Sequence, residues 1–153
     1  MASTKAVIPS VFYYTVIGLA LAFFAAPALA QDKAVFTGYK GIMIGMPTSD
    51  VREKLGKAND QTDAEDYWEF SDTESARILY DEKKKVRAIS VNYMGGESVP
   101  TPQSILGQPV EAKPDGSIFK KVEYRKDGFW ISYVKMAGED PMVIVTVQKL
   151  DRS

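Results

Sequence analysis

The chain has 153 residues, with 19 basic and 20 acidic side chains and neither cysteine nor histidine. The missing residue types exclude disulfides, a lipid-bearing cysteine, a Ser-His-Asp triad, a Cys-His nucleophile pair and a zinc site built from His and Cys. A charge balance close to zero gives no electrostatic reason to expect nucleic acid, whose phosphates call for a basic face.

Residues 1–30 are expected to form a cleavable signal peptide. Lys5 is the single charge before residue 32, an apolar run extends over residues 11–26, and Ala28-Leu29-Ala30 offers the small side chains that a signal peptidase accepts. An uncleaved membrane anchor is the alternative, because about 20 apolar residues span a bilayer. Pro27 and the small-x-small ending favour cleavage, so we expect a periplasmic or secreted protein with no stable membrane anchor.

Residues 31–153 have the length of one domain, and their first half is expected to contain a helix followed by three strands. Thr48 or Ser49 suits the helix cap, Val51 and Leu55 lie on one apolar stripe, and Gly56 ends the helix. After a polar connection, three runs bounded by short turns predict an antiparallel meander. These runs are residues 67–70, 76–80 and 86–93.

The second half begins after the Gly95–Pro100 stretch and repeats this order. Thr101 is the expected cap of a shorter helix, with Pro102 at the first helical position. Lys126-Asp127-Gly128 is typical of a tight hairpin turn. Strands are expected at residues 118–124, 129–134 and 142–148.

An alignment of the two halves on their Leu-Gly pairs suggests an internal duplication, with Trp68 on Phe119, Leu79 on Trp130 and Ile89 on Val143. The alternative is that two unrelated helix-plus-meander units align by chance. We predict an α+β fold of two tandem helix-plus-three-strand units, approximately residues 41–94 and 100–150. The units form an antiparallel sheet with short helices packed on one face.

The segment Gly45–Lys57 resembles the helix motif of the SmpA/OmlA (BamE-like) family, which runs as Gly-Met, a capping residue, a short helix containing Val, and Leu-Gly. Trp68-Glu69-Phe70 and Val86-Arg87-Ala88-Ile89 resemble that family's aromatic strand and final strand. A doubled unit is also similar to the β-lactamase inhibitory protein fold. The resemblance implies a protein that works by protein contact, although the absence of cysteine separates this chain from lipidated and disulfide-linked members.

Acidic side chains offer the main catalytic alternative, a carboxylate-dependent hydrolase. Two carboxylates in a cleft perform acid–base work on a glycoside. The acidic stretches are predicted loops, so solvation is the expected role of their side chains, which are Asp63, Glu65, Asp66, Asp72 and Glu74. The Asp-Gly pairs at 115–116 and 127–128 lack calcium-loop spacing, and the Lys83–Lys85 run is expected to be a solubilising turn. We expect no enzyme activity, no metal and no cofactor.

Apolar residues on both faces of the later strands indicate a partner surface. Trp130 and Val134 belong to one face of their strand, and apolar residues between them belong to the other. In a sheet with one solvated face, apolar and polar residues alternate more regularly. Core burial is the other explanation for any one of these residues. We predict that helices cover one side of the sheet and that the other side binds a partner, with Trp130, Phe119 and Tyr67 as anchors. A register slip of one residue would exchange the two faces.

The sequence therefore favours an exported, non-catalytic protein-binding module of the cell envelope, active in envelope assembly or as a protein inhibitor. A periplasmic hydrolase and a purely structural envelope component are the alternatives. The expected partner is another protein, contacted through an apolar sheet face, and no nucleic acid is expected.

Overall fold

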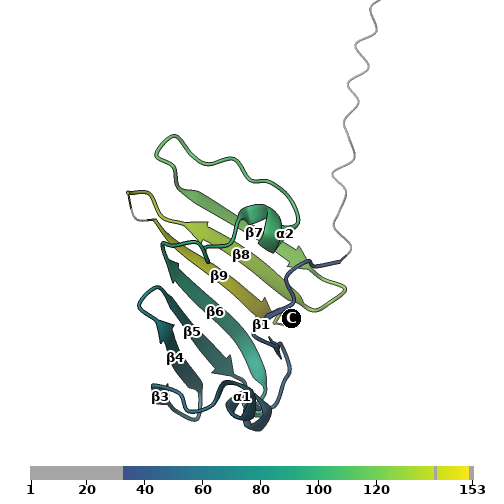
Figure 1. The fold of residues 1–153 in the computed structure, drawn as a ribbon. Coiled ribbons are helices and arrows are strands. Elements are labelled where there is room, and N and C mark those ends of the chain that lie inside the picture. Colours follow the sequence, from purple (N-terminus) through teal and green to yellow (C-terminus); the bar gives the residue numbers. More distant parts are fainter. Residues whose placement is uncertain (1–32, 140, 152–153) are drawn as a thin grey trace, which may run out of the picture.

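The computed structural model describes residues 33–139 and 141–151, so the predicted signal peptide lies outside the described residues. This part of the chain forms a two-stranded sheet, a seven-stranded sheet and two helices (Figure 1). In chain order the elements are β1 (Gly38–Tyr39), β2 (Ile42–Met43), α1 (Thr48–Leu55), β3 (Asp60–Gln61), β4 (Glu65–Ser71), β5 (Glu74–Tyr80), β6 (Val86–Met94), α2 (Pro102–Leu106), β7 (Ile118–Tyr124), β8 (Phe129–Lys135) and β9 (Met142–Lys149).

The seven-stranded sheet is antiparallel and has the order β3-β4-β5-β6-β9-β8-β7. The strands predicted in the first half correspond to β4, β5 and β6, and those predicted in the second half correspond to β7, β8 and β9. Each set is a meander of neighbouring strands. The two meanders meet where β6 pairs with β9, with Val91 opposite Val145.

The predicted α+β class is wrong, because the described residues are 45% strand and only 11% helix. Helix α1 has eight residues and α2 has five. They end at Gly56 and Gly107, whose φ values of 73° and 70° lie in the left-handed region. Strands β1, β2 and β3, which the sequence analysis did not predict, add to the strand content. The fold is mostly β.

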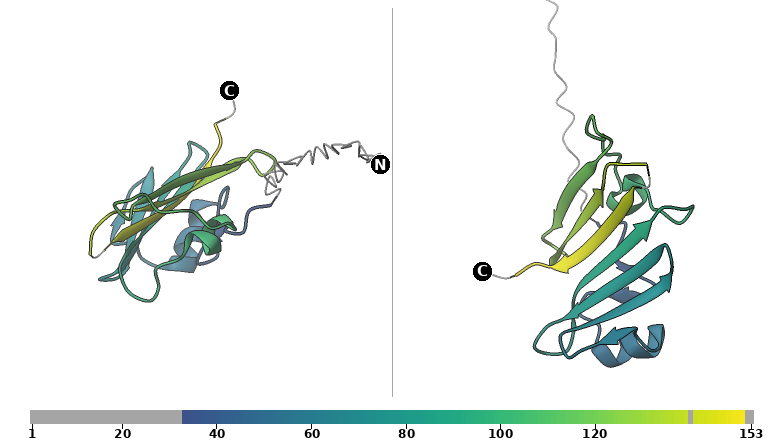
Figure 2. Two further views of the ribbon diagram at one scale, coloured as in Figure 1. Left: turned by 90° about the horizontal axis from the view of Figure 1, so that it is seen from above. Right: turned by 90° about the vertical axis from the view of Figure 1, so that its left-hand side faces the viewer.

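One face of the seven-stranded sheet, here called the core face, lies under α1, α2 and the β1–β2 hairpin (Figure 2). Ile42, Val51 and Leu106 of these covering segments are 0% exposed. Complete burial of such a side chain contributes about 1.5–3 kcal/mol. The sheet residues beneath them are apolar and belong to one hydrophobic core, which includes Trp68, Ile78, Ile89, Val91, Ile131, Tyr133, Val143, Val145 and Val147.

The opposite face, here called the open face, has no helix over it in the described part of the chain (Figure 2). Because cross-strand partners share a face, the register identifies its residues. One row runs from Phe119 through Val134 and Ile144 to Asn92.

The proposed alignment of Trp68 with Phe119 is wrong. Trp68 is 3% exposed and lies in the core, whereas Phe119 is 65% exposed on the open face. Side chains on a strand alternate between faces, so a shift of a single residue is enough to produce this error.

Asp66, in β4, is a buried carboxylate that ties α1 to the sheet. Arg52 of α1 donates two hydrogen bonds of 2.9 Å to it, from Nε to Oδ2 and from Nη2 to Oδ1. The hydroxyl of Tyr80 donates a third, at 2.7 Å. Burial, and then this bond to Asp66, raises the pKa of Tyr80. The expectation that Asp66 is a solvated loop residue is wrong, because its carboxylate is fully engaged inside the protein.

Replacement of Arg52 tests how much its hydrogen bonds to Asp66 contribute to stability. Arg52→Met leaves the Asp66 carboxylate buried with one donor in place of three, so we expect a loss of about 3 kcal/mol in the free energy of unfolding. Lys54→Met removes the same charge from the same helix turn at an exposed position and should change that free energy by less than about 0.5 kcal/mol. Urea unfolding of both variants checks the prediction, and equal losses would contradict it.

Candidate functional site on the open face

The three predicted anchors all lie on the open face. Tyr67 in β4 and Trp130 in β8 are half-buried, and Phe119 in β7 is 65% exposed. Phe119 and Trp130 are on adjacent strands, whereas β9, β6 and β5 separate Trp130 from Tyr67. The sheet therefore brings two of the three residues into one region and places Tyr67 in the other half.

Each of the two half-buried aromatic rings has a cation over it. Lys121 Nζ lies 4.8 Å from the ring centroid of Trp130, and Arg77 Cζ lies 5.9 Å from that of Tyr67. Each cation also pairs with an open-face carboxylate, Lys121 with Glu123 at 3.3 Å and Arg77 with Glu65 at 2.9 Å. A cation–π contact at an exposed site is worth about 0.5–1 kcal/mol. Each of these rings is therefore already in contact with a cation of the same chain and is only partly available to a partner.

A larger apolar surface lies at one end of the open face, and the sequence indicated only part of it, Phe119 and Val134. We call it the methionine patch, and it consists of Phe119, Val134, Met136, Met142, Ile144 and Met94. The Met136 N–H continues the ladder by donating to the Met142 carbonyl at 2.9 Å. The patch contains three of the five exposed large hydrophobic residues in the described part of the chain, with exposures of 65% for Phe119, 61% for Met94 and 48% for Met136.

Small polar side chains fill the centre of the open face beside the methionine patch. Ser90 and Thr146 share a hydrogen bond of 3.2 Å across β6 and β9. Asn92 donates to Ser75 at 3.3 Å. Because these groups satisfy one another, the centre of the face is polar but not charged.

The acidic residues considered for catalysis do not converge on a site. Asp66 is held by Arg52 and Tyr80, Asp63 pairs with Lys84 at 3.2 Å, and Glu74 accepts from a tyrosine on the core face. Within residues 33–139 and 141–151, no group of three or more acidic side chains is arranged to hold a metal ion. A hydrolytic site gains no support from this arrangement.

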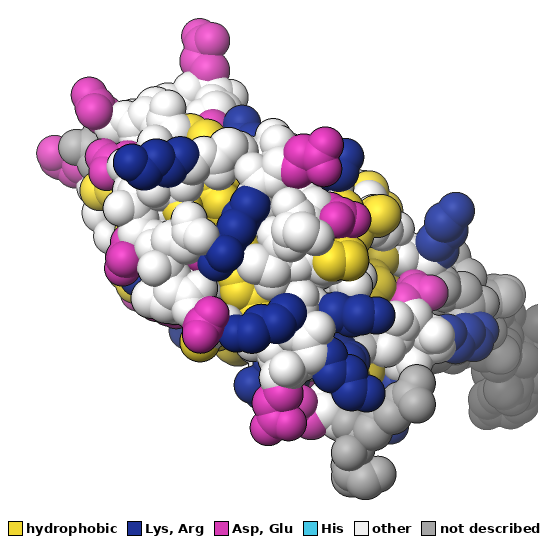
Figure 3. All heavy atoms as spheres, turned by 90° about the horizontal axis from the view of Figure 1, so that it is seen from below, with side chains coloured by type: hydrophobic (Ala, Val, Ile, Leu, Met, Phe, Trp, Pro, Cys, Tyr) yellow, Lys and Arg dark blue, Asp and Glu magenta, His cyan; other side chains and the backbone are white. Residues whose placement is uncertain are grey.

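The hairpin tip between β5 and β6 borders a depression of about 750 Å³. Asp81 accepts from the N–H groups of Lys83 and Lys85 at 2.9 and 3.0 Å and pairs with Lys149 at 3.7 Å. Arg87 pairs with Asp151 at 3.5 Å. Basic, acidic and hydrophobic side chains are intermixed on the side of the molecule shown in Figure 3. This depression is a mixed-charge surface.

A second depression, of about 440 Å³, lies beside α2 at the end of the core face. Val99, Ile118 and Val143 line it, and the hydroxyl of Tyr133 already donates to the carbonyl of Pro100 at 2.9 Å. The depression lies between the sheet and the segment that leads into α2.

Comparison with known proteins yields no family-model match, no curated relative and no solved structure. The resemblance to the SmpA/OmlA family and to the β-lactamase inhibitory protein fold therefore stays a prediction. Among the described residues, neither helix has the length and apolar character needed to cross a bilayer.

The pH dependence of stability tests the role of Asp81. Hydrogen bonds from the backbone of Lys85 and Lys83 lower the pKa of Asp81. A carboxyl group with a lowered folded-state pKa stabilises the protein above its unfolded-state pKa, and this contribution is lost as the pH falls through the folded-state value. Asp81→Asn should therefore be less stable than the wild type at pH 7, and the difference should shrink between about pH 5 and pH 3.

Thermal unfolding across this pH range measures the effect. Asp72→Asn, in the exposed turn between β4 and β5, removes an equal charge and is the charge-matched control. An Asp81→Asn difference that does not change with pH would contradict the assignment.

Proposed function

We propose that this chain is an exported, non-catalytic binding module of the cell envelope that holds another protein on the open face of its sheet. The observation that carries the proposal is the methionine patch. Its residues come from β6, β7, β8 and β9 and from the residue after β8, and they form a single surface because the register aligns them.

The composition of the patch fits protein contact. Methionine has an unbranched, polarisable side chain that adapts to partners of different shape, and both methionine and aromatic residues are enriched at interfaces. Soluble proteins rarely expose large contiguous apolar surfaces without a binding role. Phe119, at 65% exposure, is the anchor best placed to enter a partner's pocket.

The rest of the open face suits the border of such an interface. The Lys121–Trp130 and Arg77–Tyr67 contacts lie outside the methionine patch and keep their cations paired with carboxylates. Polar groups of this kind surround the apolar centre of an interface and add little energy of their own. Envelope assembly and protein inhibition, the two roles implied by the resemblance, both work by protein contact.

Capture from an envelope extract of the producing cell tests the proposal. Met94→Lys places a charge in the methionine patch at a residue that is already 61% exposed, so folding should be unaffected. We expect the wild type to retain a specific protein and Met94→Lys to retain at least about tenfold less of it. The reason is that an unpaired charge buried in the interface is costly.

Met43→Lys is the matched control, because Met43 is 52% exposed in β2, away from the open face. It should capture the same protein as the wild type. Equal capture by Met94→Lys and Met43→Lys would overturn the assignment of the open face as the binding surface.

A further inference from the structure

The β1–β2 hairpin holds Lys40 over the core-face end of the sheet. Its two-residue turn is Lys40-Gly41, with positive φ values of 47° and 78°, as in a type I′ turn. Such turns favour Asn or Gly at the first position, because a lysine there adopts an unfavourable left-handed backbone conformation. The turn geometry therefore gives no reason for a lysine at this position.

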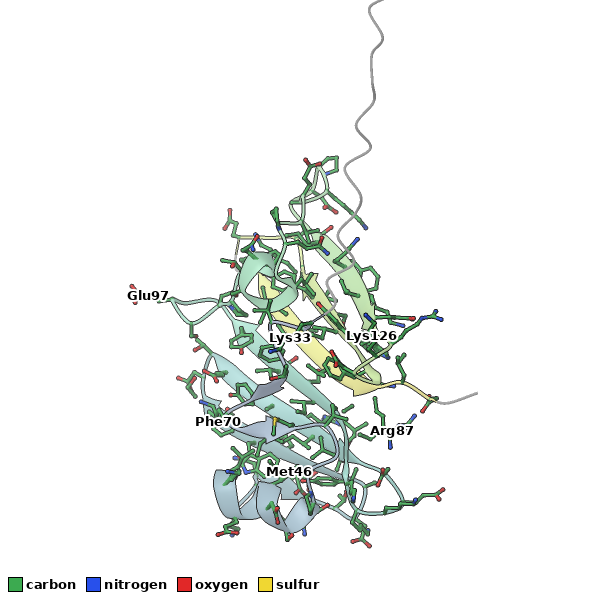
Figure 4. The ribbon with its side chains drawn as sticks, turned by 90° about the vertical axis from the view of Figure 1, so that its right-hand side faces the viewer. Lys33, Met46, Phe70, Arg87, Glu97 and Lys126 are labelled. Atoms are coloured by element: carbon green, nitrogen blue, oxygen red, sulfur yellow. The ribbon has the colours of Figure 1, made fainter. Side chains whose placement is uncertain are left out.

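The ammonium of Lys40 lies in a site formed by a carboxylate and two aromatic rings. Its Nζ is 3.3 Å from Glu74 Oε1, 4.8 Å from the ring centroid of Phe70 and 5.3 Å from that of Tyr39. Figure 4 labels Phe70 at the end of the sheet, beside the hairpin. We call Tyr39, Phe70 and Glu74 the ammonium site.

The ammonium site is ordered by contacts that do not involve Lys40. The Tyr39 hydroxyl donates to Glu74, and the Tyr39 and Phe70 rings meet edge-to-face with centroids 5.8 Å apart. Tyr39 is 7% exposed, and the side chain of Glu74 is 18% exposed. A cation that replaced the Lys40 ammonium would therefore meet the same carboxylate and the same rings.

Lys40 is a weakly held occupant. Its side chain is 42% exposed, so it reaches the site from solvent. A solvent-accessible ion pair and a cation–π contact each change an equilibrium constant by only about two- to fivefold. An external cation with the same chemistry can therefore compete with Lys40.

We propose that the ammonium site binds an organic ammonium group, either a primary amine such as a lysine side chain or a quaternary ammonium, and that Lys40 occupies the site in the free protein. Aromatic faces together with a carboxylate are the groups that recognise such cations. The site lies on the core-face side, so it is independent of the open face. Lys40 fills the site in a fraction of the molecules. The apparent affinity for an external ammonium is therefore the intrinsic affinity multiplied by the fraction of molecules whose site is free.

The Lys40→Asn variant tests this proposal. Asparagine suits the left-handed turn and removes the ammonium, so the variant should fold with an unchanged or higher unfolding midpoint. In calorimetric titrations with tetramethylammonium and with n-butylammonium, we expect Lys40→Asn to bind at least one of them about tenfold more tightly than the wild type. The Tyr39 and Phe70 ring resonances should shift on binding.

Lys84→Asn is the matched control, because Lys84 also has a positive φ, of 57°, and its ammonium pairs with Asp63. It should bind both probes as weakly as the wild type. In the Lys40→Asn background, Phe70→Leu keeps the apolar bulk but removes an aromatic face, and Glu74→Gln removes the charge; each should reverse the gain. No gain in Lys40→Asn, or an equal gain in Lys84→Asn, would overturn the proposal.

Discussion

The pairing of β6 with β9 is the constraint on which both faces of the sheet depend. Every other pairing in the seven-stranded sheet joins strands that are consecutive in the chain. Only β6–β9 joins the two meanders, and Val91 and Val145, which face each other there, are both 0% exposed. A slip of one residue would move the valines of β9 to the open face and bring Ile144 and Thr146 into the core. The cost of burying Thr146 and exposing three valines fixes the register, and the register assembles the methionine patch.

The cover of the core face is held to the sheet by polar clamps as well as by apolar contact. Each clamp joins one covering segment to one strand: Arg52 of α1 to Asp66, the Pro100 carbonyl before α2 to the Tyr133 hydroxyl, and Tyr39 of the β1–β2 hairpin to Glu74. The covering segments are short: the helices have eight and five residues, and the hairpin strands have two each. Hydrogen bonds are directional, so they add specificity to this packing; the two to carboxylates contribute about 1.5–3 kcal/mol each and the neutral one to the Pro100 carbonyl about 0.5–1.5 kcal/mol.

The sequence was sufficient to predict the six long strands, because alternating apolar residues and Gly- or charge-rich turns are local signals. It also predicted both helices, but not the β1–β2 hairpin or the polar contacts that join the covering segments to the sheet. Asp66 sits in an acidic stretch, and only the tertiary structure shows that Arg52 reaches it. Lys40 occupies a turn position that favours other residues, so the hairpin had no local signature. Tyr67, Trp130 and Phe119 lie on one face because side chains alternate along a strand, and an apolar face that includes Phe119 and Val134 is predictable in the same way. The addition of Met94 to that surface depends on the β6–β9 register, which no local pattern specifies.

In the part of the chain that the structure describes, cations lie over aromatic rings at three places, but the three are not equivalent. Beside Trp130 and Tyr67 the carboxylates Glu123 and Glu65 are 37% and 36% exposed, so water and salt screen the charges. The side chain of Glu74 is 18% exposed, so its attraction for an ammonium is screened less. The least screened of the three carboxylates therefore lies at the hairpin. On the open face, where the charged pairs satisfy each other in solvent, the proposed partner contact would rest on the apolar surface of Phe119 and the methionines.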